Sequence, residues 1–273
     1  MSFPPPLPTP KLLPQELHDL RYAKMLLENP GFTARIANLI GTPIEKGFKM
    51  LPKNWSDVVH KASKGALMKA LQLAVMTLGP RNRAKSSERF HKLLVGASGG
   101  IGGVFGLAAL PIELPVSTTI MLRSIADIAR SEGHSLSTVQ TRLSCLEVFA
   151  LGGRSAADDA VESSYWAVRA ALARAISDAA AYLAHKGVLE RSAPAIVRLI
   201  AAISSRFGVV VSEQLAAKAV PIVGAAGGTI VNVLFMDHFQ DMARGHFIVK
   251  RLEAKYGMDV VQTVYNSIAI RIS

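Results

Sequence analysis

Charged and amide side chains that interrupt apolar helical patterns are the residues of this sequence with the clearest chemical potential. Burying an ionised carboxylate without a partner costs several kcal/mol, so such groups must be paired inside a folded chain. Glu147 follows the helical spacing of Leu143 and Leu146, which turns it inward, and its expected partner is Arg123 or Arg142. The candidate buried polar cluster comprises Glu113, Arg123, Arg142, Glu147, Asn232 and Asp237.

Two interpretations fit this candidate cluster. It is either an internal network of ion pairs that fixes the register of the helices, which is the commoner case, or a polar site for an ion, a proton or a lipid headgroup. Replacing Glu113 with alanine distinguishes them. Loss of the fold supports the structural interpretation, whereas a folded protein that has lost its cellular function supports a site.

The sequence contains none of the common motifs for nucleotide binding, zinc binding or serine-nucleophile catalysis. No Gly-Lys-Ser/Thr follows the glycines, no strand pattern precedes Gly99, and no GxGxxG opens a βαβ unit, which argues against nucleotide binding. The seven histidines form no HExxH pattern, Cys145 is the one cysteine, and no GxSxG elbow is present. Asp237, His238 and Asp241 share a helix face, where a hydrogen-bonded cluster is favoured over a metal site. The sequence therefore predicts no cofactor, no metal and no catalytic residue, and favours a non-enzymatic protein.

Composition and periodicity predict an all-α fold. Half of the 273 residues are apolar but 6% are aromatic, and no segment has a strand period long enough to build a sheet. The six prolines of residues 1–14 predict a disordered arm, and residues 15–273 are predicted to form a single helical domain. One cysteine excludes an intrachain disulfide and fits a reducing compartment.

Two nearly uncharged, glycine-rich runs are expected at the centre of this domain. Residues 93–122 carry six glycines and one charge, Glu113, and residues 219–236 carry no charge. Glycines four apart give a helix a bare stripe along which a second helix can approach closely. We expect the two runs to pack side by side as the central helices of a compact multi-helix domain.

The two glycine-rich runs also align with each other. A shift of 124 residues places Gly100 on Gly224 and Glu113 on Asp237. This alignment fits either a pseudo-repeat or a chance resemblance between two apolar runs. In a pseudo-repeat, Glu113 and Asp237 would occupy corresponding places.

Proline, glycine and capping signals set the expected helix boundaries. Pro111 and Pro115 are expected to end or kink the first glycine-rich helix, so the next helix is predicted to begin at Val116. Besides residues 93–110, the predicted helices span residues 14–29, 32–51, 56–78, 116–131, 137–152, 156–186, 192–207, 209–218, 219–256 and 259–268.

Positive charge is concentrated in the first third of the chain. Residues 1–92 hold 15 Lys/Arg against 6 Asp/Glu, a net charge of +9, whereas the other residues hold 16 against 14, a net charge of +2. Aromatic interleaving and a recognisable nucleic-acid module are both absent, so this charge favours an anionic membrane surface over nucleic acid, with ordinary solubility charge as the alternative. The candidate membrane-surface residues are Arg35, Lys46, Lys49, Lys53, Arg81, Arg83, Lys85 and Arg89.

Several motifs between residues 29 and 258 resemble the EcsC family of bacterial proteins. They are Gly99–Gly103 running into Ile112–Pro115, Met121–Ala126, Arg142–Glu147, Val220–Ala225, Asn232, Asp237, Ala243, Phe247, Arg251–Glu253 and Tyr256–Gly257. The family is named for a gene beside an ABC transporter linked to protein secretion. The resemblance implies no catalytic residue.

Together these features predict a non-enzymatic protein at the cytoplasmic face of the bacterial inner membrane. Residues 32–92 would contact anionic membrane lipid or a transporter- or secretion-linked membrane protein complex, and no nucleic acid is expected. Peripheral attachment is favoured over spanning, because proline, glycine and Glu113 are poorly tolerated among lipid tails. The alternative is a soluble enzyme, or a small-ligand or ion-binding protein, that uses the buried polar cluster. The sequence defines no oligomeric state.

Overall fold

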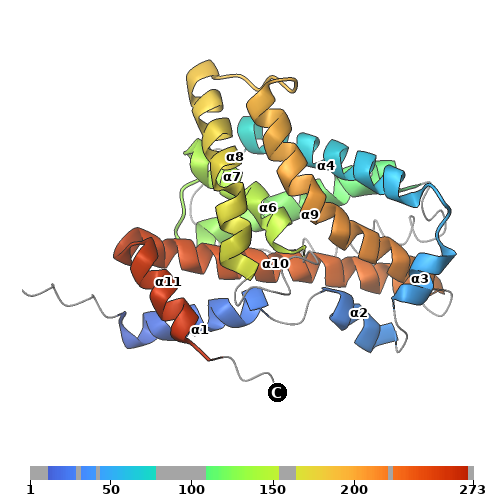
Figure 1. Cartoon of the computed structure of the whole chain (residues 1–273), viewed down its shortest axis with the longest axis horizontal. Helices are drawn as coiled ribbons and strands as arrows, with labels where there is room; N and C mark the ends of the chain where they lie inside the picture. The colour runs from blue at the N-terminus through green and yellow to red at the C-terminus, as the bar shows by residue number, and fades with distance from the viewer. Residues whose placement is uncertain are drawn as a thin grey trace, which may run out of the picture.

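The computed structural model describes residues 12–28, 32–40, 44–77, 109–153, 164–220 and 224–269, and throughout these ranges the regular structure is helical. The prediction of an all-α fold is therefore confirmed. Figure 1 shows the helices, which are α1 (Pro14–Glu28), α2 (Phe32–Ile40), α3 (Glu45–Met50), α4 (Trp55–Thr77), α6 (Leu110–Ser131), α7 (Val139–Leu151), α8 (Ser164–Lys186), α9 (Pro194–Ala219), α10 (Gly224–Tyr256) and α11 (Met258–Ser267).

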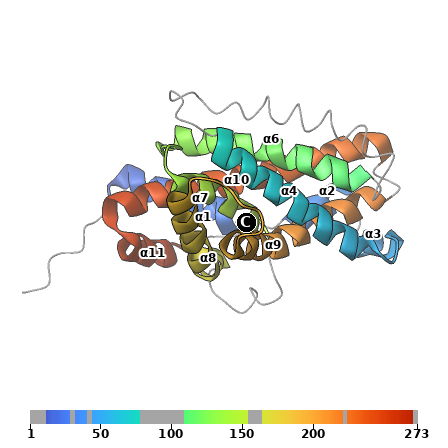
Figure 2. The ribbon, with the colours of Figure 1, turned by 90° about the horizontal axis from the view of Figure 1, so that it is seen from above.

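The long helix α10 packs against α1, α2, α6, α7, α9 and α11, and α6 lies beside it (Figures 1 and 2). The two helices run parallel. Asn232 of α10 donates to Glu113 near the start of α6, and Gln240 donates to Ser124 two to three helical turns further on. α4 packs against α6 and α9, and α9 packs against α7, α8 and α10. The result is a compact multi-helix domain.

Helices α1 and α11 cover the C-terminal half of α10. Arg251 of α10 pairs with Asp19 of α1 at 3.0 Å. Buried Lys24 of α1 donates to the carbonyl oxygens of Tyr265 and Ile268, both at 2.9 Å. These carbonyls belong to the end of α11, where a helix leaves its last acceptors unsatisfied, so Lys24 fastens α11 to α1.

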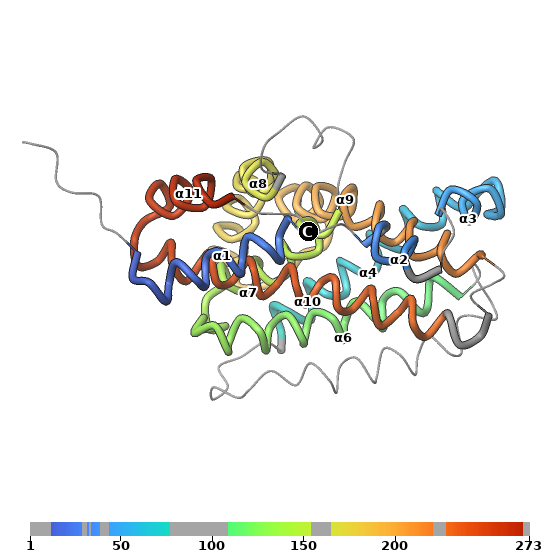
Figure 3. Tube along the Cα trace, turned by 90° about the horizontal axis from the view of Figure 1, so that it is seen from below, coloured from blue at the N-terminus to red at the C-terminus, as the bar shows by residue number. Residues whose placement is uncertain are grey.

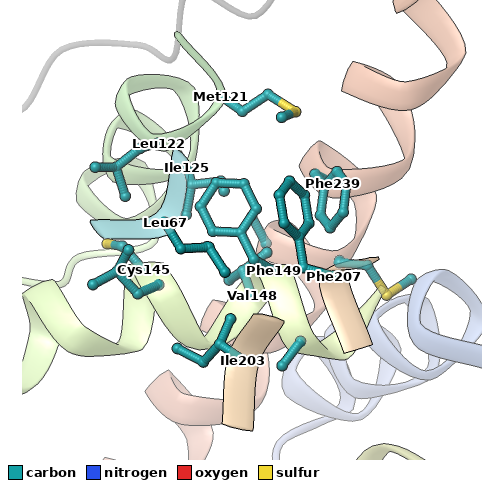
Figure 4. Packing of buried hydrophobic residues seen from close by; sticks show 14 of the residues in the cluster. Leu67, Met121, Leu122, Ile125, Cys145, Val148, Phe149, Ile203, Phe207 and Phe239 are labelled. Atoms are coloured by element: carbon teal, nitrogen blue, oxygen red, sulfur yellow. The ribbon is translucent and has the colours of Figure 1, made fainter. Parts of the chain in front are cut away.

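An aromatic cluster fills the centre of the core (Figure 4). Phe149 of α7, Phe207 of α9 and Phe239 of α10 are fully buried, and their ring centroids lie 5.2–5.7 Å apart. Two of the three pairs meet edge to face, an arrangement worth about 0.5–1.5 kcal/mol per pair beyond the burial of apolar area. This cluster fixes three helices that are distant in the sequence.

Two predicted helix boundaries are wrong. α6 begins at Leu110 and not at Val116, with Pro111 in its first turn and Pro115 inside the helix. Proline is tolerated at the start of a helix because the first amides have no intrahelical acceptor. α9 is one helix from Pro194 to Ala219, where two pieces were expected. Burial of Phe207, Val210 and Val211 offsets the roughly 1 kcal/mol that a glycine at position 208 costs a helix.

The central glycine-rich pair is described only in part. Residues 93–108 lie outside the described residues, as does the proline-rich arm up to residue 11 and the start of the predicted helix 156–186. Residues 224–236 of the second run form the start of α10. The side-by-side packing of the two runs, the pseudo-repeat and the domain boundaries stay predictions. Within the described part, Glu113 contacts Asn232, five residues before the Asp237 with which it was aligned.

Gly47 allows α3 to touch the backbone of α9. A Cβ atom at this position would lie 2.0 Å from the carbonyl oxygen of Ala216, a distance that no side chain can occupy. Gly65 of α4 is the opposite case, with nothing within 4 Å of an added Cβ. The short helix α3 is therefore held in place by close backbone contact.

Replacing Gly47 with alanine is expected to destabilise the fold by about 1–3 kcal/mol, the usual cost of overpacking, because backbone of α9 must move. Urea unfolding measures the change. Gly65→Ala is the matched control and should stabilise the fold by about 0.8–1 kcal/mol, since alanine is the better helix former. Equal effects of the two substitutions would contradict the packing of α3 on α9.

Candidate functional site

A polar cluster joins the start of α6, the end of α9 and α10. Glu113 Oε1 accepts from Lys218 Nζ at 2.6 Å and from Asn232 Nδ2 at 3.1 Å. Asn232 Oδ1 in turn accepts from Gln214 Nε2 at 2.8 Å. We call Glu113, Lys218, Asn232 and Gln214 the helix-end cluster.

The helix-end cluster is almost closed to solvent. The side chains of Lys218 and Glu113 are 8% and 12% exposed, and Asn232 is fully buried. A carboxylate in the first turn of α6 also meets the positive end of that helix dipole. The Glu113–Lys218 pair neutralises both charges, and one hydrogen bond joins the two amides. Chemically, the cluster is a connector of three helices.

Sequence reasoning found half of the helix-end cluster. The structure brings together the predicted Glu113 and Asn232, and adds Lys218 and Gln214. Lys218 had a signal, because it is the last charge before the uncharged residues 219–236. Gln214 precedes Lys218 by four residues and therefore shares its helix face, but its type gives no warning of burial.

The partner expected for Glu147 is wrong. Glu147 Oε2 lies 3.4 Å from Nε2 of His246, and both side chains are buried. His246 Nδ1 lies 3.0 Å from the hydroxyl of Tyr165, which also accepts from Arg169 at 3.4 Å. Arg169 forms two hydrogen bonds with Glu253, at 2.5 and 3.0 Å. A second buried network thus connects α7, α8 and α10.

Burial controls protonation in this second network. It lowers the pKa of His246 below the ordinary value of 6.5, although Glu147 opposes the effect. Burial also raises the pKa of the Tyr165 hydroxyl, so the phenol stays protonated. In a neutral His246, Nδ1 can accept from the Tyr165 hydroxyl while Nε2 faces the Glu147 carboxylate. This arrangement avoids an uncompensated positive charge in the core.

The other predicted members of the cluster lie elsewhere. Arg123 is on the exposed side of α6, and Arg142 donates to the carbonyl oxygens of Val75 at 2.8 Å and Ser137 at 3.3 Å. Asp237 is half-buried on α10 and has partners of its own. The six candidates therefore do not form one site.

Unpaired lysines occupy α3, the turn after it and the solvent side of α4. Lys46, Lys49 and Lys53 are exposed as predicted, and Lys61, Lys64 and Lys69 extend the set. No carboxylate in the described ranges pairs with any of the six. The exposed acids of α3 and α4 are Glu45 and Asp57. We call these six lysines the lysine surface.

The other candidate membrane-surface residues fall outside the lysine surface. Arg35 pairs with Asp241 at 2.8 Å and is three-quarters buried, which corrects its assignment to a free surface. Arg81, Arg83, Lys85 and Arg89 lie outside the described residues. Within the described part, no group of three His, Cys, Asp or Glu side chains could hold a metal ion.

Among the described residues, one helix is long and apolar enough to cross a membrane by length and composition alone. This helix is α9 (Pro194–Ala219). Its buried residues include Ile203 and Phe207 of the aromatic core, and the core helix of a soluble protein passes the same test. The length of α9 is therefore weak evidence for a span.

Within the described ranges, the helical core and its internally paired charges define a compact all-α protein. The chain belongs to the EcsC protein family, whose model matches residues 15–252. The predicted family is therefore confirmed, and α11 lies beyond the matched range. Neither the comparison with curated proteins nor that with solved structures gives a match.

Glu113→Ala is expected to lower the free energy of unfolding by about 3–5 kcal/mol, because it leaves Lys218 buried without its carboxylate. Urea unfolding monitored by circular dichroism measures this loss. The paired replacement Glu113→Leu with Lys218→Met removes both charges and should recover most of the stability. A double variant as unstable as the single one would contradict the pairing as the source of the effect.

Acidification is expected to destabilise the protein as the pH falls below about 6.5, because a histidine with a depressed pKa binds its proton more readily when unfolded. His246→Gln should reduce this slope. This substitution should not abolish the pH dependence of stability, since burial also lowers the pKa of His134. The measurement is the free energy of unfolding across this pH range, with exposed His185→Gln as the control. A slope that His246→Gln leaves unchanged would refute the assignment.

Proposed function

We propose that this protein binds the surface of anionic membranes through its lysine surface, as a non-enzymatic peripheral protein at the cytoplasmic face of the bacterial inner membrane. The observation that carries the proposal is the contrast between cations. Arg35, Arg169, Lys218 and Arg251 are all paired with carboxylates of the same chain. The six exposed lysines of α3 and α4 are not, and their charge is free for an external anion.

The electrostatic attraction available to the lysine surface is sufficient for reversible attachment. Each basic residue close to an anionic bilayer contributes about 1 kcal/mol, and this attraction decays within a Debye length of roughly 10 Å. Six lysines against two exposed acids leave a net charge of +4 on this part of the chain. Attachment of this kind is weakened by salt.

Packing holds the start of the lysine surface in a fixed position. Gly47 places α3 against the backbone of α9, and the rings of Phe48 and Trp55 lie 5.5 Å apart across the turn into α4. Met50 is 53% exposed between Lys49 and Lys53. An apolar side chain set between cations supports contact with the interface of a bilayer more than with water alone.

The same charges would also fit an acidic surface of a transporter- or secretion-linked membrane complex. Protein-free vesicles separate the two partners, because binding to lipid alone needs no complex. The alternative of an enzyme or ligand-binding protein gains no support from the helix-end cluster, whose four side chains are hydrogen-bonded to one another and nearly closed to solvent.

Vesicles containing phosphatidylglycerol are expected to bind the protein at low salt, whereas phosphatidylcholine vesicles are not. The variant Lys46→Gln, Lys49→Gln, Lys53→Gln should lose about tenfold or more in affinity, given about 1 kcal/mol per cation. Co-sedimentation at two salt concentrations measures the effect.

The matched control removes three exposed cations from α1 and α8, through Arg21→Gln, Arg174→Gln and Lys186→Gln. Its net charge equals that of the lysine variant. Equal losses from the two variants would show that total charge, and not the lysine surface, governs binding. Full binding by the lysine variant would refute the proposal.

A further inference from the structure

Helix α11 is turned back on the rest of the molecule by one residue. α10 ends at Tyr256 and α11 begins at Met258, so Gly257 alone joins them. Gly257 has φ 84° and ψ 155°, a backbone conformation that essentially only glycine adopts. Nothing lies within 4 Å of a Cβ atom added there. The bend between the two helices therefore depends on the dihedral angles of one exposed glycine.

Helical hydrogen bonding continues on both sides of this glycine. The amide of Gly257 donates to the carbonyl oxygen of Glu253 at 2.9 Å, and its own carbonyl oxygen accepts from the amide of Val261 at 3.3 Å. Each bond has the spacing of four residues that defines an α-helix. Helical dihedral angles at Gly257 would therefore join α10 and α11 into one helix from Gly224 to Ser267. Such a helix would project α11 about 15 Å beyond the end of α10.

Residues of α1 and α8, distant from α11 in the sequence, hold α11 in place. Lys24 of α1 donates to the carbonyl oxygens of Tyr265 and Ile268 at its C-terminal end, both at 2.9 Å. The centroid of the Tyr265 ring lies 5.8 Å from that of Tyr165 and 5.5 Å from that of Trp166. Figure 3 shows α11 beside α1 and α8. We call Lys24, Tyr165 and Trp166 the docking surface of α11.

The stability of α11 depends on this docking surface. Its buried residues are Val261 and Tyr265, whereas Met258, Asp259 and Thr263 are exposed. α11 has 10 residues, and a helix of this length is marginal when isolated in water. It therefore needs either a surface to pack on or a longer helix to extend.

Release of α11 with nothing in its place would be unfavourable. Lys24 is 7% exposed, and the nearby carboxylate of Glu28 is 3.9 Å away, beyond hydrogen-bond distance. A buried cation that loses its acceptors is strongly destabilised, and Tyr165 and Trp166 would lose the ring that covers them. A second copy of α11 would restore these contacts, because it carries the same carbonyl oxygens and the same tyrosine.

We propose that two copies of this chain exchange α11, so that the docking surface of each is filled by the helix of its partner. Exchange retains the contacts of Lys24 and Tyr265 and replaces the bend at Gly257 with a continuous helix. The arrangement is reciprocal, so it closes at two copies as a two-fold symmetric dimer. The dimer is favoured by high protein concentration and by any change that disfavours the bend. It is independent of membrane binding by the lysine surface.

Gly257→Ala tests the bend. An alanine disfavours a positive φ by about tenfold, and a dimer replaces two bends, so the monomer–dimer equilibrium constant should shift about a hundredfold toward the dimer. Light scattering across a dilution series measures the shift. Gly187→Ala is the matched control, because Gly187 also has a positive φ, 68°, and open space around it. It follows the end of α8, so this control should leave the equilibrium unchanged.

Cross-linking identifies the segment that passes between the copies. Cys145 is fully buried, so a cysteine introduced at the surface reacts selectively in the folded protein. Exposed Met25 of α1 and exposed Asn266 of α11 flank the contact between Lys24 and the end of α11. Chains of the hinge variant with Met25→Cys are mixed with chains of the hinge variant with Asn266→Cys. A short bifunctional maleimide should then join unlike chains in the dimer.

The same mixture with the native hinge should give the same product in smaller yield, after equilibration at high concentration in mild urea and dilution. A folded Gly257→Ala chain that stays monomeric across the dilution series overturns the exchange. A dimer without the mixed cross-link uses another interface and likewise overturns it. If Gly257→Ala does not fold, the native-hinge mixture decides, and absence of its cross-link is the contrary result. These readouts need no vesicles, so a failure of membrane binding does not affect them.

Discussion

The pairing of Glu113 with Lys218 is the interaction on which one end of this molecule depends. Each charge comes from an end of a long helix, and both are almost closed to solvent, so neither could be buried without the other. The pair sets α6 against α9, and Asn232 adds α10 to the same carboxylate. Close backbone contact at Gly47 then carries this arrangement to α3. The position of the first exposed lysines follows from a buried ion pair.

Charges in the described part of the chain are sorted by environment. Inside, Arg169 meets Glu253 and Lys24 meets the carbonyl oxygens at the end of α11, because a buried cation without acceptors would be strongly unfavourable. On α3 and α4 the lysines remain in water, where hydration replaces a partner. Surface lysines contribute little to folding, so their accumulation on two consecutive helices is not explained by stability. It fits selection for contact with an external anion.

Helical periodicity was enough to predict the all-α fold and most of the helices, because a helix that buries one face has apolar residues at helical spacing. Boundaries failed where local signals conflicted with packing. Pro115 and Gly208 both lie inside helices whose buried faces outweigh their local cost. Glu113 and Asn232 were recognisable as inward-facing, but Glu147 was assigned an arginine because its true partner, His246, is neutral and 99 positions away. Charge counting cannot find a neutral partner of that kind.

The structural and functional interpretations of Glu113 need not exclude each other. A carboxylate facing a bilayer would be repelled by anionic headgroups and would cost free energy to dehydrate, so an end that approaches a membrane must hide it. Lys218 does this from within the chain, and leaves Ile112, Val116 and Ile230 as the exposed groups nearby. An ion pair that fixes helix register therefore also keeps a free carboxylate off the surface at the start of α6. On this view, the membrane contact that we propose requires no rearrangement of the buried charges.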